Sequence, residues 1–236
     1  MSHLPPICRP SIRPGAVLAA IVSIAACSAV GVGGTTRVGT PPYERGSGHV
    51  TTVSRTLGAF HAVAASQGVR VSVSTGPSSG ARVTVDDNLA DNITTEVRDG
   101  TLHVDVSGSI ETATPLDVSV TASTPLDAIS AGTGASVDTE DVSAPALSVH
   151  VSTGASVRAG GRASSLDLSA KTGATADLRN VEAASAQVHV GTGSTAFVNV
   201  GTSVRGDCTG GSTLHVRGAA ASVDVASDVS SSVEQE

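Results

Sequence analysis

A short turn sequence returns five times in the second half of the chain at nearly constant spacing. It reads Thr-Gly-Ala-Ser twice and then varies to Thr-Gly-Ala-Thr, Thr-Gly-Ser-Thr and Gly-Gly-Ser-Thr. Its second residue is Gly134, Gly154, Gly173, Gly193 and Gly211, so successive turns lie 20, 19, 20 and 18 residues apart. A period in this range is typical of solenoids, in which each repeat packs only against its neighbours. The spacing predicts an all-β fold, a single-stranded parallel β-helix with coils of 18–20 residues.

Apolar and polar residues alternate on both sides of each turn, with the period of a β-strand. The columns expected to face inward are Ile129, Val149, Leu168, Val188 and Gly206; Ala131, Val151, Ala170, Val190 and Cys208; and Val137, Val157, Ala176, Ala196 and Leu214. The columns between them are expected to face outward. Coils stack about 4.8 Å apart, so each inward column would form a continuous rod of core. The bias of parallel crossovers favours a right-handed coil.

Composition excludes some functions. The net charge is -7, and no Lys/Arg cluster follows the N-terminal segment, so the chain lacks the basic surface that nucleic acid requires. The three cysteines show neither metal-binding nor redox spacing, and we expect Cys208 to be a buried small hydrophobe. No pattern indicates a cofactor.

The N-terminal residues have the pattern of an export signal. Arg9 and Arg13 precede an apolar run over residues 16–26, which is the length of a signal-peptide core and short for a membrane span. The run ends at Cys27 in Ile-Ala-Ala-Cys, which resembles the lipobox of bacterial lipoproteins. We therefore expect a signal peptide over 1–27 and a lipid anchor on Cys27 at the outer face of the membrane, with plain secretion as the alternative. The Gly-, Thr- and Pro-rich residues 28–54 are expected to form a flexible linker.

From Arg55 onward, alternating segments predict strands, and Asp99-Gly100 predicts a hairpin turn. The segments are Val69-Arg70-Val71-Ser72-Val73, Asp87-Asn88-Leu89, Ile93-Thr94-Thr95-Glu96-Val97 and Asp99-Gly100-Thr101-Leu102, followed by the repeated turns. In this order they resemble the bacterial "putative auto-transporter adhesin, head GIN domain" family, a domain of unknown function. The resemblance implies a β-helical domain over 55–225 of an exported or surface protein, and it brings no catalytic residues. We expect residues 55–75, with Phe60 as a plug, to cap the coil, and residues 226–236 to be a disordered acidic tail.

Several side chains could carry chemistry. His150 and His189 share an outward column but lie two coils apart, about 10 Å, which is too far for one metal ion. Calcium is a further alternative for two acidic clusters, which match no known calcium loop. Their residues are Asp86, Asp87 and Asn88, and Asp138, Glu140 and Asp141. Asp138 and Asp177 have Arg158 between them, a pattern of surface ion pairing rather than of a glycosidase carboxylate pair. A polysaccharide-active enzyme is therefore disfavoured.

The remaining hypotheses are non-catalytic. An adhesin-like module could bind cell-envelope polysaccharide or a surface protein through an outward polar column, for which Ser148, Asp167, Gln187 and Arg205 are the candidates. The alternative is an envelope scaffold or spacer without a specific ligand.

Overall fold

The computed structural model describes residues 43–236, in which 17 strands and one short 3-10 helix account for nearly all regular structure. The predicted signal peptide, Cys27 and linker residues 28–42 lie outside the described residues. The N-terminal strands are β1 (Glu44–Arg45), β2 (Val50–Thr56), β3 (Ala62–Ala65), β4 (Arg70–Thr75), β5 (Gly80–Asp86), β6 (Ile93–Arg98), β7 (Thr101–Val106), β8 (Ile110–Glu111) and β9 (Asp117–Ala122), with the helix η1 (Asp87–Leu89) after β5. The strands of the repeats are β10 (Ala128–Ala131), β11 (Ser136–Ser152), β12 (Ser156–Lys171), β13 (Thr175–Gly191), β14 (Thr195–Thr209), β15 (Thr213–Arg217), β16 (Ser222–Ser227) and β17 (Ser232–Gln235).

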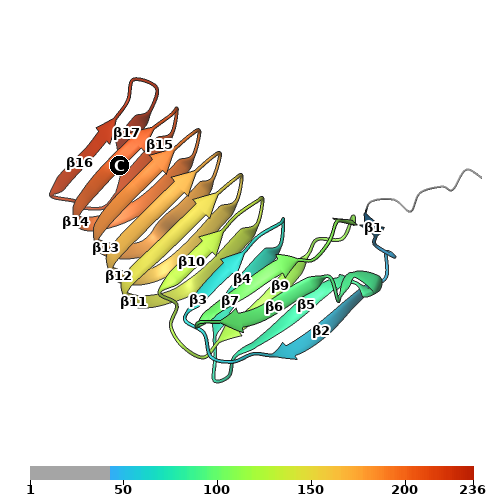
Figure 1. Cartoon of the computed structure of the whole chain (residues 1–236). Coiled ribbons are helices and arrows are strands. Elements are labelled where there is room, and N and C mark those ends of the chain that lie inside the picture. Colours follow the sequence, from blue (N-terminus) through green and yellow to red (C-terminus); the bar gives the residue numbers. More distant parts are fainter. Residues whose placement is uncertain (1–42) are drawn as a thin grey trace, which may run out of the picture. The chain divides into compact units, whose positions relative to one another are not determined.

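The repeats form a parallel β-solenoid, as the turn spacing predicts (Figure 1). Strands β11 to β14 each pair in parallel with the next and bend partway along, where the register shifts. Each long strand therefore contributes to two sheets on opposite sides of one core. We call the sheet that leads into the Thr-Gly turns the groove face; it contains residues 128–131, 148–151, 167–170, 187–190 and 205–208. The sheet that leaves the turns is the return face; it contains residues 136–139, 156–159, 175–178, 195–198 and 213–216.

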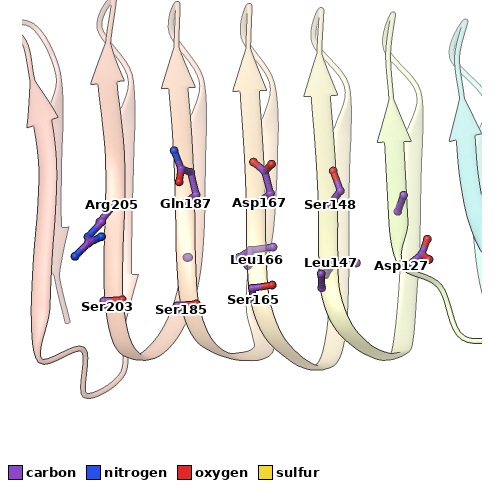
Figure 2. Close-up of a pocket in the computed structure, with 13 residues that line it drawn as sticks. Asp127, Leu147, Ser148, Ser165, Leu166, Asp167, Ser185, Gln187, Ser203 and Arg205 are labelled. Atoms are coloured by element: carbon purple, nitrogen blue, oxygen red, sulfur yellow. The ribbon is translucent and has the colours of Figure 1, made fainter.

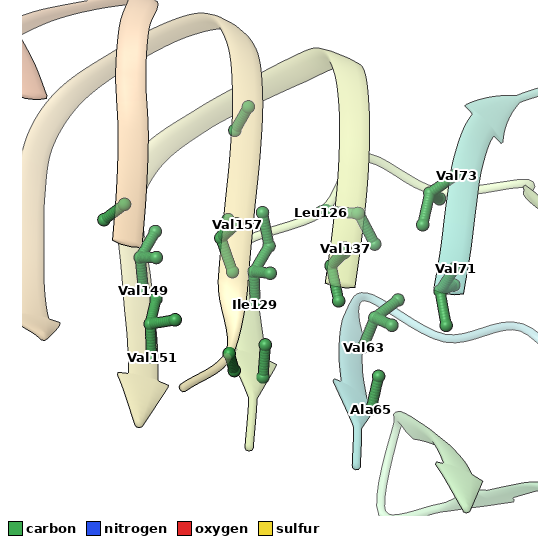
Figure 3. Packing of buried hydrophobic residues seen from close by; sticks show 14 of the residues in the cluster. Val63, Ala65, Val71, Val73, Leu126, Ile129, Val137, Val149, Val151 and Val157 are labelled. Carbon is green, nitrogen blue, oxygen red and sulfur yellow. The ribbon is translucent and has the colours of Figure 1, made fainter. Parts of the chain in front are cut away.

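The predicted register is confirmed. Val149 pairs with Ile129 and Leu168, and Val157 pairs with Val137 and Ala176, so the apolar columns continue from coil to coil. Their side chains are almost fully buried, and Figure 3 shows those of the first coils meeting inside the solenoid. Cys208 is buried in its column, as expected. Gly206 is the exception, because this member of an apolar column has no side chain and its backbone lies close to Val188.

The turns have left-handed backbone angles at two successive residues, and not at the glycine alone. Both central residues have positive φ, for example 55° at Thr153 and 69° at Gly154, which is the pattern of a type I′ turn. The threonines stack, but the hydrogen bonds between turns run along the backbone, as from Gly154 N to Thr172 O at 3.0 Å. The stacked backbone bonds continue the sheet ladder around each corner.

The N-terminal end is capped by a larger structure than the predicted cap over 55–75. On the return-face side, β4 is followed outward by β9, β5 and β2, and on the other side β3 is followed by β7 and β6. The predicted hairpin is confirmed, since Asp99 and Gly100 join β6 to β7 with φ of 50° and 75°. Phe60 is buried, as a plug should be. The linker prediction is wrong for the described residues before 55: β2 pairs antiparallel with β5, whose edge would otherwise be unpaired.

The C-terminal residues form a last coil, so the prediction of a disordered tail over 226–236 is wrong. β16 pairs with β14 and β17 pairs with β15, both in parallel. Asp228 closes the corner between them, where its carboxylate accepts hydrogen bonds from Gly210 N at 2.7 Å and Ser230 N at 3.1 Å. These bonds hold the pKa of Asp228 well below its ordinary value, with the Gly210 amide as the largest cause. A low apolar content did not prevent order here, because the preceding coil offers an open backbone edge.

Candidate functional site

The four residues proposed as a binding face lie in one row on the groove face. Ser148 pairs with Asp167, Asp167 with Gln187, and Gln187 with Arg205, each on the next coil. Figure 2 shows the four side chains in line across the coils. We call this set the polar ladder. The stacking of coils gives its members a spacing close to the strand separation of about 4.8 Å.

A shallow groove of about 670 Å³ runs along the polar ladder. Its other side is a row of serines two positions earlier on the coils, which we call the serine row (Figure 2): Ser165, Ser185 and Ser203. Asp127 lies at one end, where its carboxylate is 2.9 Å from His61 Nδ1. The serine row and Asp127 were not among the predicted site residues. The turn alignment contains the signal for the serines, because all three stand eight residues before a turn glycine.

Most of the ladder's polar groups have no side-chain partner in the described part of the chain. Ser148 Oγ lies 3.3 Å from His150 Nε2, but no side-chain hydrogen bond or ion pair engages Asp167, Gln187 or Arg205 within residues 43–236. Asp167, Gln187 and Arg205 are exposed. The groove therefore offers a carboxylate, an amide and a guanidinium, which together can accept and donate hydrogen bonds along a ligand.

The histidine column lies beside the ladder, as predicted. His150 pairs with Ser169, Ser169 with His189, and His189 with Asp207. His189 Nδ1 is hydrogen-bonded to the Asp207 carboxylate. The order Ser169, His189, Asp207 has the residue types of a nucleophilic triad, but no hydrogen bond links Ser169 to His189 within residues 43–236, so the serine is not activated in this geometry. In the same part of the chain, no group of three or more His, Cys, Asp or Glu residues is placed to hold a metal ion.

The first acidic cluster considered for calcium is used in the fold. Asp86 is buried, and its two carboxylate oxygens accept hydrogen bonds from Thr112 Oγ1 at 2.7 Å and Thr114 Oγ1 at 2.8 Å. These hydroxyls, Thr112 first, hold the pKa of Asp86 below its ordinary value. Asp87 accepts a hydrogen bond from Ser47 Oγ. The cluster thus fastens the loop after β5 to the segments around it.

The return face carries the carboxylates considered for glycoside hydrolysis. Asp177 accepts hydrogen bonds from Arg179 Nε at 2.9 Å and Nη2 at 2.7 Å, and Arg158 Nη2 lies 3.6 Å away. Arg179 is the main cause that lowers the pKa of Asp177, so this carboxyl group is poorly suited to donate a proton. The predicted ion pairing is confirmed for Arg158 and Asp177, whereas no ion pair engages Asp138 within residues 43–236.

Phe197, the outward aromatic of the return face, is in contact with two side chains from other coils. The His215 ring stacks on it with centroids 4.5 Å apart and planes at 8°. Arg179 lies over the ring, 4.6 Å from the centroid. Phe197 therefore links three coils, and its ring is already engaged by His215 and Arg179 rather than free to stack on a sugar.

The fold and the groove define a class of protein: a parallel β-solenoid that displays a row of polar side chains along its length. Within residues 43–236, no helix is long and apolar enough to cross a membrane. The family model described as "Putative auto-transporter adhesin, head GIN domain" matches residues 59–220, and the chain belongs to this family.

Solved structures show the same fold. A putative adhesin from Bacteroides fragilis matches with a TM-score of 0.63 at 14% identity, covering 81% of this chain and 99% of that chain. A putative adhesin from Parabacteroides distasonis matches with a TM-score of 0.52 at 16% identity, covering 82% of this chain and 100% of that chain. A comparison with curated proteins found no significant match.

Proposed function

We propose that this chain is a non-catalytic adhesin-like module that binds an extended polysaccharide of the cell envelope along the groove. The observation that carries the proposal is the polar ladder, whose Asp167, Gln187 and Arg205 side chains are exposed and unengaged within residues 43–236. Membership of a family of putative adhesins supports a binding role. A surface protein is the alternative partner. The groove favours a linear ligand instead, because its polar groups repeat along one axis.

The groove suits many weak contacts rather than one tight one. Its groups are exposed to water, so each hydrogen bond to a ligand contributes only about 0.5–1.5 kcal/mol. A linear polymer that spans several coils would make such contacts in series, and repeated engagement of one polymer raises the overall affinity. A short oligosaccharide should bind weakly by the same reasoning. Length dependence of binding is thus a property of the proposed mode.

The groove is tested by replacing the polar ladder as a set. We expect the variant Ser148→Ala, Asp167→Ala, Gln187→Ala and Arg205→Ala to lose at least about tenfold in affinity for its polysaccharide, since several hydrogen bonds are removed at once. The measurement is a glycan array followed by titration of the full chain with the polymer that binds, alongside envelope fractions.

The control replaces the same number of outward residues on the same coils of the return face: Ser156→Ala, Thr175→Ala, Thr195→Ala and Thr213→Ala. This variant should bind as the unmodified chain does, and both variants should keep the far-UV circular dichroism spectrum of a β-protein. Equal loss in the two variants would contradict the groove as the binding site. Absence of binding to every glycan and envelope fraction would contradict the adhesin function and leave the scaffold.

Export and anchoring form the second part of the proposal. The apolar run before Cys27 and its Ile-Ala-Ala-Cys end support an acylated cysteine that holds the protein to the outer face of the membrane. We expect Cys27→Ser to move the protein from the membrane fraction to the medium and to remove the lipid mass from the intact protein. A Cys27→Ser variant that stayed in the membrane fraction and kept the mass of the lipid would contradict lipid attachment at this residue.

A further inference from the structure

A second polar cavity lies on the return face, on the other side of the core from the groove. It has a volume of about 220 Å³, and we call it the arginine pocket after the residues that line it: Arg158, Asp177, Arg179, Asn180 and Arg217. Strand β12 supplies Arg158, β13 supplies Asp177, Arg179 and Asn180, and β15 ends at Arg217.

A register shift creates the arginine pocket. Leu178 on β13 pairs with Val198 on β14, but the next residue of β14, Asn199, pairs with Glu182. Residues 179–181 therefore have no partner on the following coil, and Arg179 and Asn180 stand at the bulge. Because β14 is shorter by these residues, Arg217 from the coil beyond can line the same cavity.

The pocket concentrates positive charge on an acidic protein. Three guanidinium groups face one carboxylate, whereas the whole chain has a net charge of -7. Arg179 and Asp177 are paired, and this contact raises the pKa of Arg179, with a smaller contribution from Glu236. No carboxylate lies within 4.0 Å of the Arg217 guanidinium among the described residues. Like charges held together are unfavourable unless an anion neutralises them.

We propose that the arginine pocket binds a phosphate or sulfate group. Guanidinium groups donate paired hydrogen bonds to such oxyanions, and these charge-assisted bonds are among the stronger ones in proteins. The three arginines come from three different coils, so they can approach a tetrahedral group from several directions, whereas a planar carboxylate offers oxygens in one plane. The volume is several times the roughly 30 Å³ of a water molecule, which leaves room for such a group.

Replacing Arg217 tests anion binding separately from the stability of the solenoid. Arg179 also braces Asp177 and Phe197, so its removal would disturb the coil stack. Arg217 makes no ion pair within residues 43–236 and is exposed. Arg162 is a matched control, because it is an exposed arginine on a neighbouring part of the solenoid whose Nε pairs with Glu182 at 3.0 Å outside the pocket.

In the experiment, the full chain is titrated with inorganic phosphate, sulfate and acetate at low ionic strength. Binding is measured by calorimetry. We expect phosphate and sulfate to bind at one saturable site, acetate to bind much more weakly, and Arg217→Gln to weaken phosphate binding about tenfold. Arg162→Gln should leave the affinity within about twofold. An unchanged affinity in Arg217→Gln, or acetate binding equal to phosphate binding, would overturn the proposal.

Two further arms complete the test. Polyphosphate that binds more tightly than free phosphate would identify a polymer as the source of the group, and equal binding would identify the free ion. The variant that lacks the polar ladder should bind phosphate normally, because the groove and the arginine pocket lie on opposite faces. Failure of polysaccharide binding in the groove is therefore distinguishable from failure of the arginine pocket.

Discussion

Replacing Gly206 with alanine should destabilise the solenoid by about 3 kcal/mol or more. Gly206 has a φ of 144°, and a Cβ built on it would lie 1.7 Å from the backbone oxygen of Val188, its partner on the preceding coil. The atoms that the Cβ would meet belong to the Val188 backbone, which cannot turn aside as a flexible side chain could. The substitution must therefore push β14 away from β13 and weaken the ladder between two coils, in addition to the strain of the backbone angle.

The control for this prediction is Gly154→Ala. Gly154 also has positive φ, 69°, but nothing lies within 4 Å of an added Cβ. Its replacement should cost only the left-handed strain, about 1–2 kcal/mol. Urea unfolding of the two variants, with equal dependence on denaturant concentration, would measure the difference. If both variants lost the same stability, close approach of the coils would not be the reason for glycine at 206.

Truncating Phe60 to alanine should cost about 3–5 kcal/mol of unfolding free energy. Phe60 is 1% exposed and is the largest fully buried side chain of the described residues, and its carbonyl oxygen accepts a hydrogen bond from Thr124 Oγ1. Removing the ring leaves a cavity beneath the N-terminal sheets, which cover the open end of the coil. Because each coil is stabilised by its neighbours, loss of the cap should also expose the first coils to unfolding.

Phe197→Ala is the matched control, because it removes the same side chain from the surface. The ring at 197 stacks on His215 and contacts Arg179, contacts that contribute about 1–2 kcal/mol together. We expect Phe60→Leu to recover most of the loss, since it refills the site. Thermal and urea unfolding of the full chain would compare the three variants. A cost for Phe60→Ala no greater than that for Phe197→Ala would contradict its role as a plug.

The row of polar residues in the groove was predictable from the turn alignment, whereas the residues of the arginine pocket were not. Ser148, Asp167, Gln187 and Arg205 could be aligned because equal distance from the turn glycines means equal position on the coil. The serine row follows from the same alignment. By contrast, Arg179 stands at no fixed position in that alignment, because it belongs to a bulge whose place depends on how two coils of unequal length pair.

The sequence by itself determined the solenoid, its register, the inward columns and the Asp99-Gly100 hairpin. All of these depend on alternation and turn preference, which act over a few residues and then repeat. Only the tertiary structure decided the order of residues 44–54 and 226–236, because β2 is held by the backbone edge of β5, and β16 and β17 are held by the open edges of β14 and β15. The same holds for Asp86, whose carboxylate is fixed by two threonines more than 25 residues later. Contacts between different coils have no signal within a few residues of sequence, so the arginine pocket became visible only when the coils β12 to β15 were stacked.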